Sequence, residues 1–434
     1  MRIKLAYGRE GMWIDVPDHA SVTVIEPRYV DGLPDEAAAI RAALESPLDT
    51  SPLRELARGR SKAAVVFSDI TRPMPNERVL PVLLEALAQA GLRDDQIVLI
   101  NGLASHRKQT PEELERMIGA GIAAQSGHRP EGRRYRILQH DAWDDANLVP
   151  VAENSAGHTV RINREYMEAD LRILTGFIEP HFFAGFSGGP KAVLPGIADI
   201  DAVMDNHNAP MINHPNATWA VTHGNPIWEE MYRIAALTHP DFLLNVTLNK
   251  HKHITGVFAG DLTAAHTAGT AFVRRTAMQP VDAPFDVVIT SNSGYPLDLN
   301  LYQAVKGMSA AAQVVCEGGD IIIAAECWDG IPTHGQYARL LREAPSLEAL
   351  YETIMTPGFR SPDQWQAQVQ AKIQRKARVH VFAGGLSDQE MREAKVIACR
   401  SIEQTLEGIL ARNPGARIGI LPEGPQTVPY LPER

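Results

Sequence analysis

The sequence predicts an α/β protein of two domains, each built on a mainly parallel sheet, with a Rossmann-like fold in the N-terminal domain. The chain has 434 residues, more than one hydrophobic core usually serves. Short runs rich in Val, Ile and Leu alternate with helical patterns, and continuously apolar runs suit strands that are buried on both faces of a parallel sheet. We expect an active-site cleft between the domains, because α/β proteins usually bind ligands at the carboxyl ends of strands.

The predicted elements follow one another in the order that is typical of βαβ units. Strands are predicted at 63–69, 96–102, 171–176, 285–292, 318–328, 378–385 and 416–424, and helices at 79–91, 111–121 and 302–315. A stretch with two prolines and no periodicity, MQPVDAPF, separates the two halves at 278–285. We therefore expect a cofactor-binding domain over 1–279 and a substrate-side domain over 280–412, with the segment 413–434 packing back on the first domain.

Composition and charge exclude several classes of protein. The formal net charge is -10, so no positive field exists to hold a nucleic acid or an anionic membrane. The start of the chain has no apolar signal-peptide core and no segment is apolar enough to span a bilayer, so we expect a cytosolic protein. The three cysteines are odd in number and lack CxxC spacing, which argues against both a disulfide framework and a thiolate zinc site.

The segment 176–207 carries the densest chemical signal. Gly185, Ser187, Gly188 and Gly189 follow a predicted strand and lead to Lys191. Glycines let backbone N–H groups approach an anion, and a lysine adds a charge, so a phosphate or carboxylate cradle is one interpretation. An ordinary tight turn is the other. The GxxxxGK[ST] spacing of a P-loop is absent.

Polar side chains also follow other predicted strands. Asp69 and Arg72 come after the strand at 63–69, where a ligand crevice or an Asx turn with a solvated arginine are the two interpretations. His106 follows the next strand, as a candidate base or a solvated loop residue. Gln303 and Lys306 are three residues apart on a predicted helix, so they share one face, as a ligand-binding pair or a surface pair.

These segments together resemble the nickel-dependent lactate racemase family. The similarity runs from about residue 50 to about residue 425 through the motifs SDxTRP, GFIExHFFAGFSGG-x-K-x-VLPGIA, FAGD, GYPLD-x-N-x-YQAVKGM and PDQW. The resemblance implies a 2-hydroxy acid racemase or epimerase that carries a nickel pincer nucleotide, a pyridinium-3-thioamide-5-thiocarboxylic acid mononucleotide. Lys191 matches the lysine that holds it covalently, and His207 matches the one protein ligand of the nickel. Asp69, Gly188 and Gly189 match positions beside this cofactor.

The family's reaction removes hydrogen from C2 of the substrate as hydride, gives a planar 2-keto acid, and returns the hydride to either face. Removing a proton from that carbon would demand a base stronger than any side chain supplies. His106 and His181 match the two histidines that take the hydroxyl proton, one for each enantiomer. The residues that match the substrate-binding and pocket-wall positions are Arg72, Gln303, Lys306, Tyr302 and Trp365.

Three departures from the family pattern bear on the substrate. The loop GLASHRKQT is two residues longer before His106 and has Lys108 in place of a proline. Pro190 replaces the arginine that commonly precedes Lys191, so one cation and one backbone donor are absent there. The loop 327–337 also differs. We therefore weigh malate or another 2-hydroxy acid beside lactate, with Lys108 or this loop meeting a second carboxylate.

The residues leave a few alternatives to a racemase. A non-catalytic homologue that binds or carries the cofactor or a hydroxy acid is the main alternative, although a pair of histidine bases would then have no purpose. An NAD-linked dehydrogenase lacks support because no GxGxxG follows the first strand. The resemblance further implies partners that build the cofactor and insert nickel, and it leaves the oligomeric state open, a homo-oligomer included.

Overall fold

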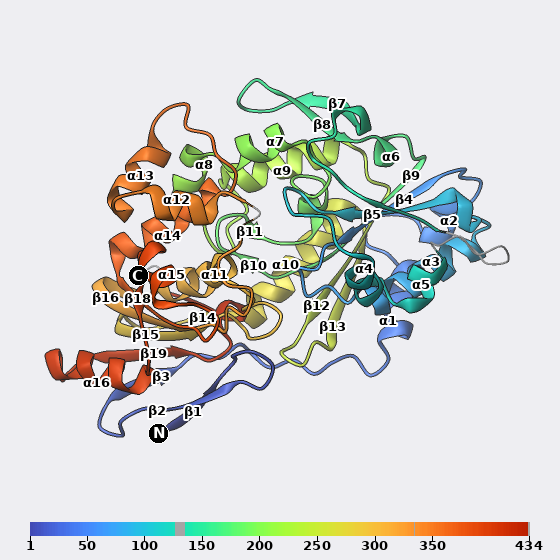
Figure 1. Ribbon diagram of the computed structural model, residues 1–434. Coiled ribbons are helices and arrows are strands. Elements are labelled where there is room, and N and C mark those ends of the chain that lie inside the picture. Colours follow the sequence, from blue (N-terminus) through green and yellow to red (C-terminus); the bar gives the residue numbers. More distant parts are fainter. Residues whose placement is uncertain (126–134, 334, 433–434) are drawn as a thin grey trace. The chain divides into compact units, whose positions relative to one another are not determined.

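The computed structural model describes residues 1–125, 135–333 and 335–432, and the chain forms two compact units (Figure 1). Each unit contains a six-stranded sheet whose strands are mainly parallel, so the predicted fold class is confirmed. Unit 1 consists of Met1–Arg28, Asn208–Pro215 and Arg274–Arg434, and unit 2 of Tyr29–His207 and Asn216–Val273.

The sheet of unit 2 has the strand order β13-β12-β9-β4-β5-β6, and only the β12–β13 pair is antiparallel. Its strands are β4 (Ala63–Ser68), β5 (Ile97–Gly102), β6 (Arg136–Gln139), β9 (Leu171–Phe177), β12 (Phe242–Leu248) and β13 (Ile254–Gly260). The helices of this unit are α1 (Glu36–Glu45), α2 (Leu53–Ala57), α3 (Asn76–Gln89), α4 (Pro111–Ile118), α5 (Ala120–Gln125), α6 (Arg164–Met167), α7 (Ile200–Asn206), α9 (Pro226–Leu237) and α10 (Leu262–Ala277), which crosses the boundary between the units.

The strand order of unit 2 determines where a ligand can bind. From β4 the chain proceeds to β5 and β6 on one side, and then to β9, β12 and β13 on the other. The order therefore reverses between β4 and β9, and such a switch point leaves a crevice at the carboxyl ends of the two strands. An apolar core of β-strand and helix side chains, which includes Val65, Phe67 and Leu83, fixes the sheet beneath it.

The sheet of unit 1 is parallel throughout, with the order β18-β17-β16-β15-β19-β3. Its strands are β3 (Ser21–Val24), β15 (Phe285–Ser291), β16 (Val315–Ala324), β17 (Arg378–Phe382), β18 (Ile397–Ala398) and β19 (Arg417–Leu421). Its helices are α8 (Ala209–Asn213), α11 (Leu301–Ala312), α12 (Tyr337–Glu343), α13 (Leu347–Met355), α14 (Gln364–Lys376), α15 (Asp388–Glu393) and α16 (Ile402–Arg412).

The described residues also form four short two-stranded sheets and four 3-10 turns. The strands pair as β1 (Arg2–Leu5) with β2 (Met12–Asp15), β7 (Leu148–Glu153) with β8 (Thr159–Asn163), β10 (Pro180–His181) with β11 (Gly185–Phe186) and β14 (Met278–Pro280) with β20 (Val428–Tyr430). The 3-10 turns are Asp94–Gln96, Asp145–Asn147, Gly189–Ala192 and Gly424–Gln426. Within the described part of the chain, every helix is too short or too polar to cross a bilayer.

The division of the chain differs from the expected one at both ends. The first 28 residues belong to unit 1, because β3 pairs in parallel with β19 and the Ile25 N–H donates to the Ile420 carbonyl over 2.8 Å. The segment 413–434 was expected to return to the N-terminal domain, but it supplies β19 to the sheet of unit 1, between β15 and β3. Sequence periodicity identifies a strand but carries no information about its partner, which explains the difference.

Candidate active site

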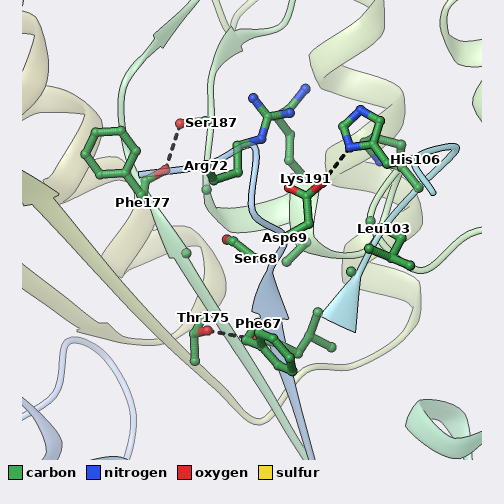
Figure 2. A pocket seen from close by; sticks show the side chains of 18 residues that line it. Phe67, Ser68, Asp69, Arg72, Leu103, His106, Thr175, Phe177, Ser187 and Lys191 are labelled. Atoms are coloured by element: carbon green, nitrogen blue, oxygen red, sulfur yellow. Dashed lines mark hydrogen bonds and ion pairs between the residues drawn. The ribbon is translucent and has the colours of Figure 1, made fainter. Parts of the chain in front are cut away.

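A pocket lies at the carboxyl ends of β4, β5 and β9, at the switch point of the unit 2 sheet. The segment 187–196 closes it from the other side, and the space between the atoms amounts to about 590 Å³, part of it open to solvent. Figure 2 shows that Arg72, His106 and Lys191 gather here, with Asp69 beside them. All four side chains had been singled out as candidates from the sequence.

Asp69 and His106 are hydrogen-bonded to each other within this pocket. Oδ2 of Asp69 lies 2.6 Å from Nδ1 of His106 (Figure 2), and Oδ1 of Asp69 accepts a hydrogen bond from the Thr71 hydroxyl over 2.8 Å. Asp69 is buried, whereas His106 keeps about a quarter of its side chain exposed to the pocket. Burial opposes the charged form of Asp69, but His106, Arg72 and the hydroxyl outweigh it and lower the pKa of this carboxyl. Asp69 is therefore an anion that holds His106, and not a simple turn residue.

The long loop before His106 is anchored on the segment opposite. The Ala104 N–H donates to the Gly196 carbonyl over 3.0 Å, and Ala104 adopts a positive φ of 50°. The His106 N–H in turn donates to the Leu103 carbonyl over 2.8 Å. The loop is thus tight and backbone-bonded, and it delivers His106 to Asp69.

Lys191 enters the pocket from a short 3-10 turn, Gly189–Ala192. Gly188 and Gly189 precede it with φ values of 72° and 50°, a conformation that residues with a Cβ rarely adopt. The side chain of Lys191 is only 9 % exposed, and its Nζ lies 5.7 Å from the centre of the Phe183 ring. An amine that is largely shielded from water yet open to a pocket is suited to carry a bound group.

His207 directly follows α7 and is buried. Its ring meets Phe183 edge-on at 5.1 Å between centres. Burial, and secondarily the charge of Lys191, lowers the pKa of His207 to about 3. The imidazole is therefore neutral at pH 7, which is the form that binds a metal.

His181 contacts the same aromatic ring. The centres of the His181 and Phe183 rings are 4.5 Å apart, and the Ala184 N–H donates to Nδ1 of His181 over 3.3 Å. His181 is buried and does not line the pocket. Phe183 thus touches the three groups that the resemblance singles out, His181, Lys191 and His207, although the sequence analysis did not include it.

The glycines behave differently from a simple anion cradle. Gly188 lines the pocket, but Gly189 does not, and its N–H donates to Oδ1 of Asn245 over 2.9 Å. His266 contacts the same turn, with Nε2 at 3.0 Å from the Ser187 carbonyl oxygen. Sequence reasoning missed both residues. The asparagine within the apolar run FLLNVTL, at 242–248, was the available signal, because a buried polar side chain in a strand needs a partner.

Four predicted substrate-side residues lie in unit 1. Gln303 and Lys306 are on α11, which confirms the helix predicted at 302–315, and Gln303 is buried. Asn300 caps this helix by accepting from the Gln303 N–H over 3.1 Å. Nε1 of Trp365 donates to the Tyr302 hydroxyl over 2.9 Å, so the two aromatic residues expected to wall the pocket contact each other.

Two family models match the chain: the lactate racemase N-terminal domain over residues 7–220 and the lactate racemase C-terminal domain over residues 281–428. The chain belongs to the lactate racemase family. This membership confirms the family predicted from the motifs and, with it, the enzyme class, an isomerase of the racemase type.

Individual lactate racemases are similar over nearly the whole chain. The enzyme of Lactiplantibacillus plantarum is 36 % identical over 415 residues, and the alignment covers 95 % of each protein. That of Thermoanaerobacterium thermosaccharolyticum is 33 % identical over 431 residues, with 97 % of each covered. The structure of the lactate racemase apoprotein from T. thermosaccharolyticum has a TM-score of 0.90 at 31 % identity, and the match covers 99 % of this chain and 100 % of that one.

The side chains of this member of the lactate racemase family can be compared with what a bound metal would need. Among residues 1–125, 135–333 and 335–432, no group of three His, Cys, Asp or Glu side chains is placed to hold an ion. The neutral His207 and the shielded amine of Lys191 both contact Phe183, so the residues present fit a metal-bearing group that is tethered at Lys191.

Proposed function

We propose that this protein interconverts the two enantiomers of lactate. One arrangement carries the proposal: a pocket at the switch point of unit 2 that holds the Asp69–His106 pair together with the cations Arg72 and Lys191. Full-length similarity to two lactate racemases supports the same reaction. A small 2-hydroxy acid offers such a pocket a carboxylate for Arg72 and a hydroxyl for the imidazole.

Lys191 and His207 are the residues that we assign to the nickel pincer nucleotide. Lys191 would hold it through its amine and His207 would bind the nickel as a neutral imidazole, the form that the lowered pKa of His207 favours. The chemistry that the bound nucleotide supplies is reversible acceptance of two electrons and a hydrogen from C2, which avoids a carbanion beside a carboxylate. Gly188, at the edge of the pocket, lets the backbone approach it closely.

His106 is assigned to the hydroxyl proton of the substrate. Asp69 accepts the hydrogen on Nδ1 of His106, so the neutral ring presents the lone pair of Nε2. The anion also stabilises the imidazolium that forms when Nε2 takes the proton. We therefore assign Asp69 a positioning role that acts through His106; the position beside the cofactor that the resemblance implied for it stays a prediction.

His181 is assigned to the hydroxyl of the other enantiomer. Its Nδ1 accepts the Ala184 N–H over 3.3 Å, so in the neutral ring the hydrogen lies on Nε2, and uptake of the hydroxyl proton requires the ring to exchange this contact for the other tautomer. His181 thus differs from His106, whose Nδ1 donates to Asp69. The carboxylate of the substrate is assigned to Arg72, whose planar fork can form two parallel hydrogen bonds with it.

The unit 1 residues complete the assignment. Gln303 and Lys306 are proposed to bind the substrate from α11, with the Lys306 ammonium stabilising negative charge on the substrate oxygen. Tyr302 and Trp365, which are hydrogen-bonded to each other, are proposed to wall the substrate site. The cytosolic location and the partners that build the cofactor and insert nickel stay predictions from the sequence.

Lactate is favoured over malate by the position of Lys108. Its Nζ lies 2.9 Å from Oδ2 of Asp141, and it does not line the pocket. A lysine that is already paired with a carboxylate is a poor receptor for a second carboxylate of the substrate. The loop 327–337 is the other segment considered for a second carboxylate. Its Trp328 lies 6.2 Å from Tyr295 between ring centres, and both residues line a separate hollow of unit 1 together with Arg9.

The experiment that tests this function uses protein made in a host that also has the cofactor-building enzymes. We expect an added mass on Lys191, nickel bound to the protein, and formation of the opposite enantiomer from either pure enantiomer of lactate. The variant Lys191→Arg should show none of the three and still fold. Added mass and nickel without turnover of any 2-hydroxy acid would favour the non-catalytic carrier, and an unmodified Lys191 in wild-type protein would overturn the assignment.

A further inference from the structure

Two buried side chains that do not line the pocket contact the turn that leads to Lys191. Asn245 lies in the middle of β12 and His266 lies on α10, and both are almost completely buried. Each contacts a peptide group next to Gly188: the Ser187 carbonyl on one side and the Gly189 N–H on the other. The backbone at Gly188 is therefore bonded on both sides.

Asn245 is linked to Lys191 through a single peptide group. The Gly189 N–H donates to Oδ1 of Asn245 over 2.9 Å, and the carbonyl of that same peptide group, on Gly188, accepts from the Lys191 N–H over 3.2 Å. Peptide groups are planar, so fixing the N–H end also fixes the carbonyl end. The orientation of Asn245 therefore sets the start of the 3-10 turn that carries Lys191.

His266 fixes the preceding peptide group. Its Nε2 lies 3.0 Å from the Ser187 carbonyl oxygen, and since that oxygen only accepts, Nε2 carries the hydrogen. Burial, partly offset by this hydrogen bond, lowers the pKa of His266 to about 4, so the ring stays neutral. Ser187 is held further by its own hydroxyl, which donates to the Phe177 carbonyl over 2.7 Å (Figure 2).

The two side chains also explain why glycine occupies both positions of the turn. A Cβ on Gly188 would lie 2.6 Å from Oδ1 of Asn245, and a Cβ on Gly189 would lie 2.5 Å from Cδ2 of His266. Both distances are shorter than a Cβ atom can approach another heavy atom, so a larger residue at either position would displace Asn245 or His266. The glycine pair thus serves close contact with Asn245 and His266, in addition to its positive φ angles.

We propose that Asn245 and His266 are positioning residues that fix the two peptide groups around Gly188 and thereby hold the amine of Lys191 at the pocket. That Lys191 carries a bound group rests on the proposed function. That Asn245 and His266 fix the turn before Lys191 does not depend on it. Neither side chain lines the pocket, so neither is assigned to the substrate or to the chemistry. Losing either bond leaves a buried peptide group without its partner and frees the turn to change conformation.

The test uses paired substitutions in the full chain. Asn245→Leu removes the acceptor and Asn245→Asp keeps it; His266→Phe removes the donor and His266→Gln keeps one. Asn249→Leu is the matched control, because Oδ1 of Asn249 accepts the N–H groups of His251 and His253 at 3.0 and 3.1 Å in a turn that does not line the pocket. The two pairs are independent, so one remains informative if a variant of the other does not fold.

Two measurements separate this inference from the proposed function. Hydrogen exchange of the backbone at 187–192 is followed in protein without cofactor, and the mass added at Lys191 is followed in protein from a cofactor-producing host. We expect Asn245→Leu and His266→Phe to speed exchange and to lower the loaded fraction about tenfold, the effect of losing one or two net hydrogen bonds. Asn245→Asp and His266→Gln should restore much of both, and Asn249→Leu should change neither.

Normal loading in Asn245→Leu and His266→Phe, or an equal loss of loading in Asn249→Leu, would overturn the inference and leave the proposed function standing. Unchanged exchange at 187–192 in both variants would overturn it as well. If wild-type protein itself gained no mass at Lys191, the proposed function would fail, while the exchange comparison would still decide whether Asn245 and His266 hold the turn.

Discussion

Nδ1 of His106 lies 2.6 Å from Oδ2 of Asp69, although the two side chains come from loops that follow different strands. Asp69 follows β4 directly, and His106 follows β5 after a loop that is anchored on Gly196. Because β4 and β5 are parallel neighbours, their loops meet at one edge of the sheet. The sheet order thus brings the two loops together, and the anchor of the second loop on Gly196 completes the pair. Its removal gives the sharpest test of the proposed chemistry.

Asp69→Asn should lower kcat for lactate about 10²- to 10⁴-fold, since the ring loses the anion that fixes its tautomer and stabilises its protonated form. KM should change little, because Asp69 is not assigned to the substrate. Steady-state rates with both pure enantiomers measure this split. Thr71→Val, which removes only the hydroxyl bonded to Oδ1 of Asp69, is the control and should have a small effect. A kcat that stays near wild type in Asp69→Asn would refute the role given to this pair.

Arg72→Lys should raise KM for lactate about ten- to hundredfold, because a single ammonium replaces two parallel, charge-assisted hydrogen bonds. Arg107→Lys is the control: Arg107 lies exposed in the neighbouring loop after β5 and bonds both carboxylate oxygens of Glu113 at 2.7 Å, and its replacement should leave KM unchanged. Equal effects of the two substitutions would mean that Arg72 does not bind the substrate.

His207→Ala should greatly reduce the nickel bound per protein while the mass added at Lys191 persists. The neutral imidazole of His207 is the proposed protein ligand, whereas the tether is a separate bond. Nickel analysis and intact-protein mass on the same sample check both parts. His214→Ala, a change to an exposed histidine seven residues further on, should leave the nickel content intact. Full nickel occupancy in His207→Ala would exclude His207 as the ligand.

Lys108→Ala should leave the preference for lactate over malate unchanged, because Lys108 is paired with Asp141. Side-by-side assays of lactate, malate and longer 2-hydroxy acids in wild type and variant provide the measurement. A wild-type preference for malate that Lys108→Ala abolishes would reinstate Lys108 as a receptor for the second carboxylate.

The protein without cofactor should lose stability between about pH 6.5 and pH 4. Burial lowers the pKa of both His140 and His266 to about 4, so below pH 6.5 the unfolded chain binds protons that the folded protein excludes. The free energy of unfolding therefore falls as the pH drops, by about 2 kcal/mol per histidine at pH 5. Urea unfolding at several pH values measures the slope, which should be shallower in His266→Gln. An identical slope in that variant would show that His266 is not the source.

The sequence predicted the fold and most of the candidate site because both depend on local signals. Apolar runs identified the strands, and the loops after them contain Asp69, Arg72 and His106, which parallel pairing then brings together. The contact between Asp69 and His106 could not be predicted, since it depends on where the loop before His106 is anchored. The cleft expected between the two domains stays a prediction.

Residues whose role is to contact backbone groups or aromatic rings could not be identified from the sequence. Asn245 and His266 come from a strand and a helix that have no recognisable motif, and their partners are backbone groups, which every residue has. Phe183 is one of several aromatic residues in its segment, and only the fold shows that its ring contacts both His207 and Lys191. The partner of β3 was equally inaccessible, because strands at opposite ends of the chain carry no mark of their pairing.

The pairing of β3 with β19 also constrains how the protein is made. Residues 21–24 leave the ribosome long before the strand beside them in the sheet, Arg417–Leu421, so β3 cannot pair until residues 417–421 have been made. Every strand of the other sheet lies between residues 63 and 260, and it can fold while synthesis continues. Until then β3 has no partner strand and the β15 edge of the sheet is open, and unpaired strand edges are prone to aggregation.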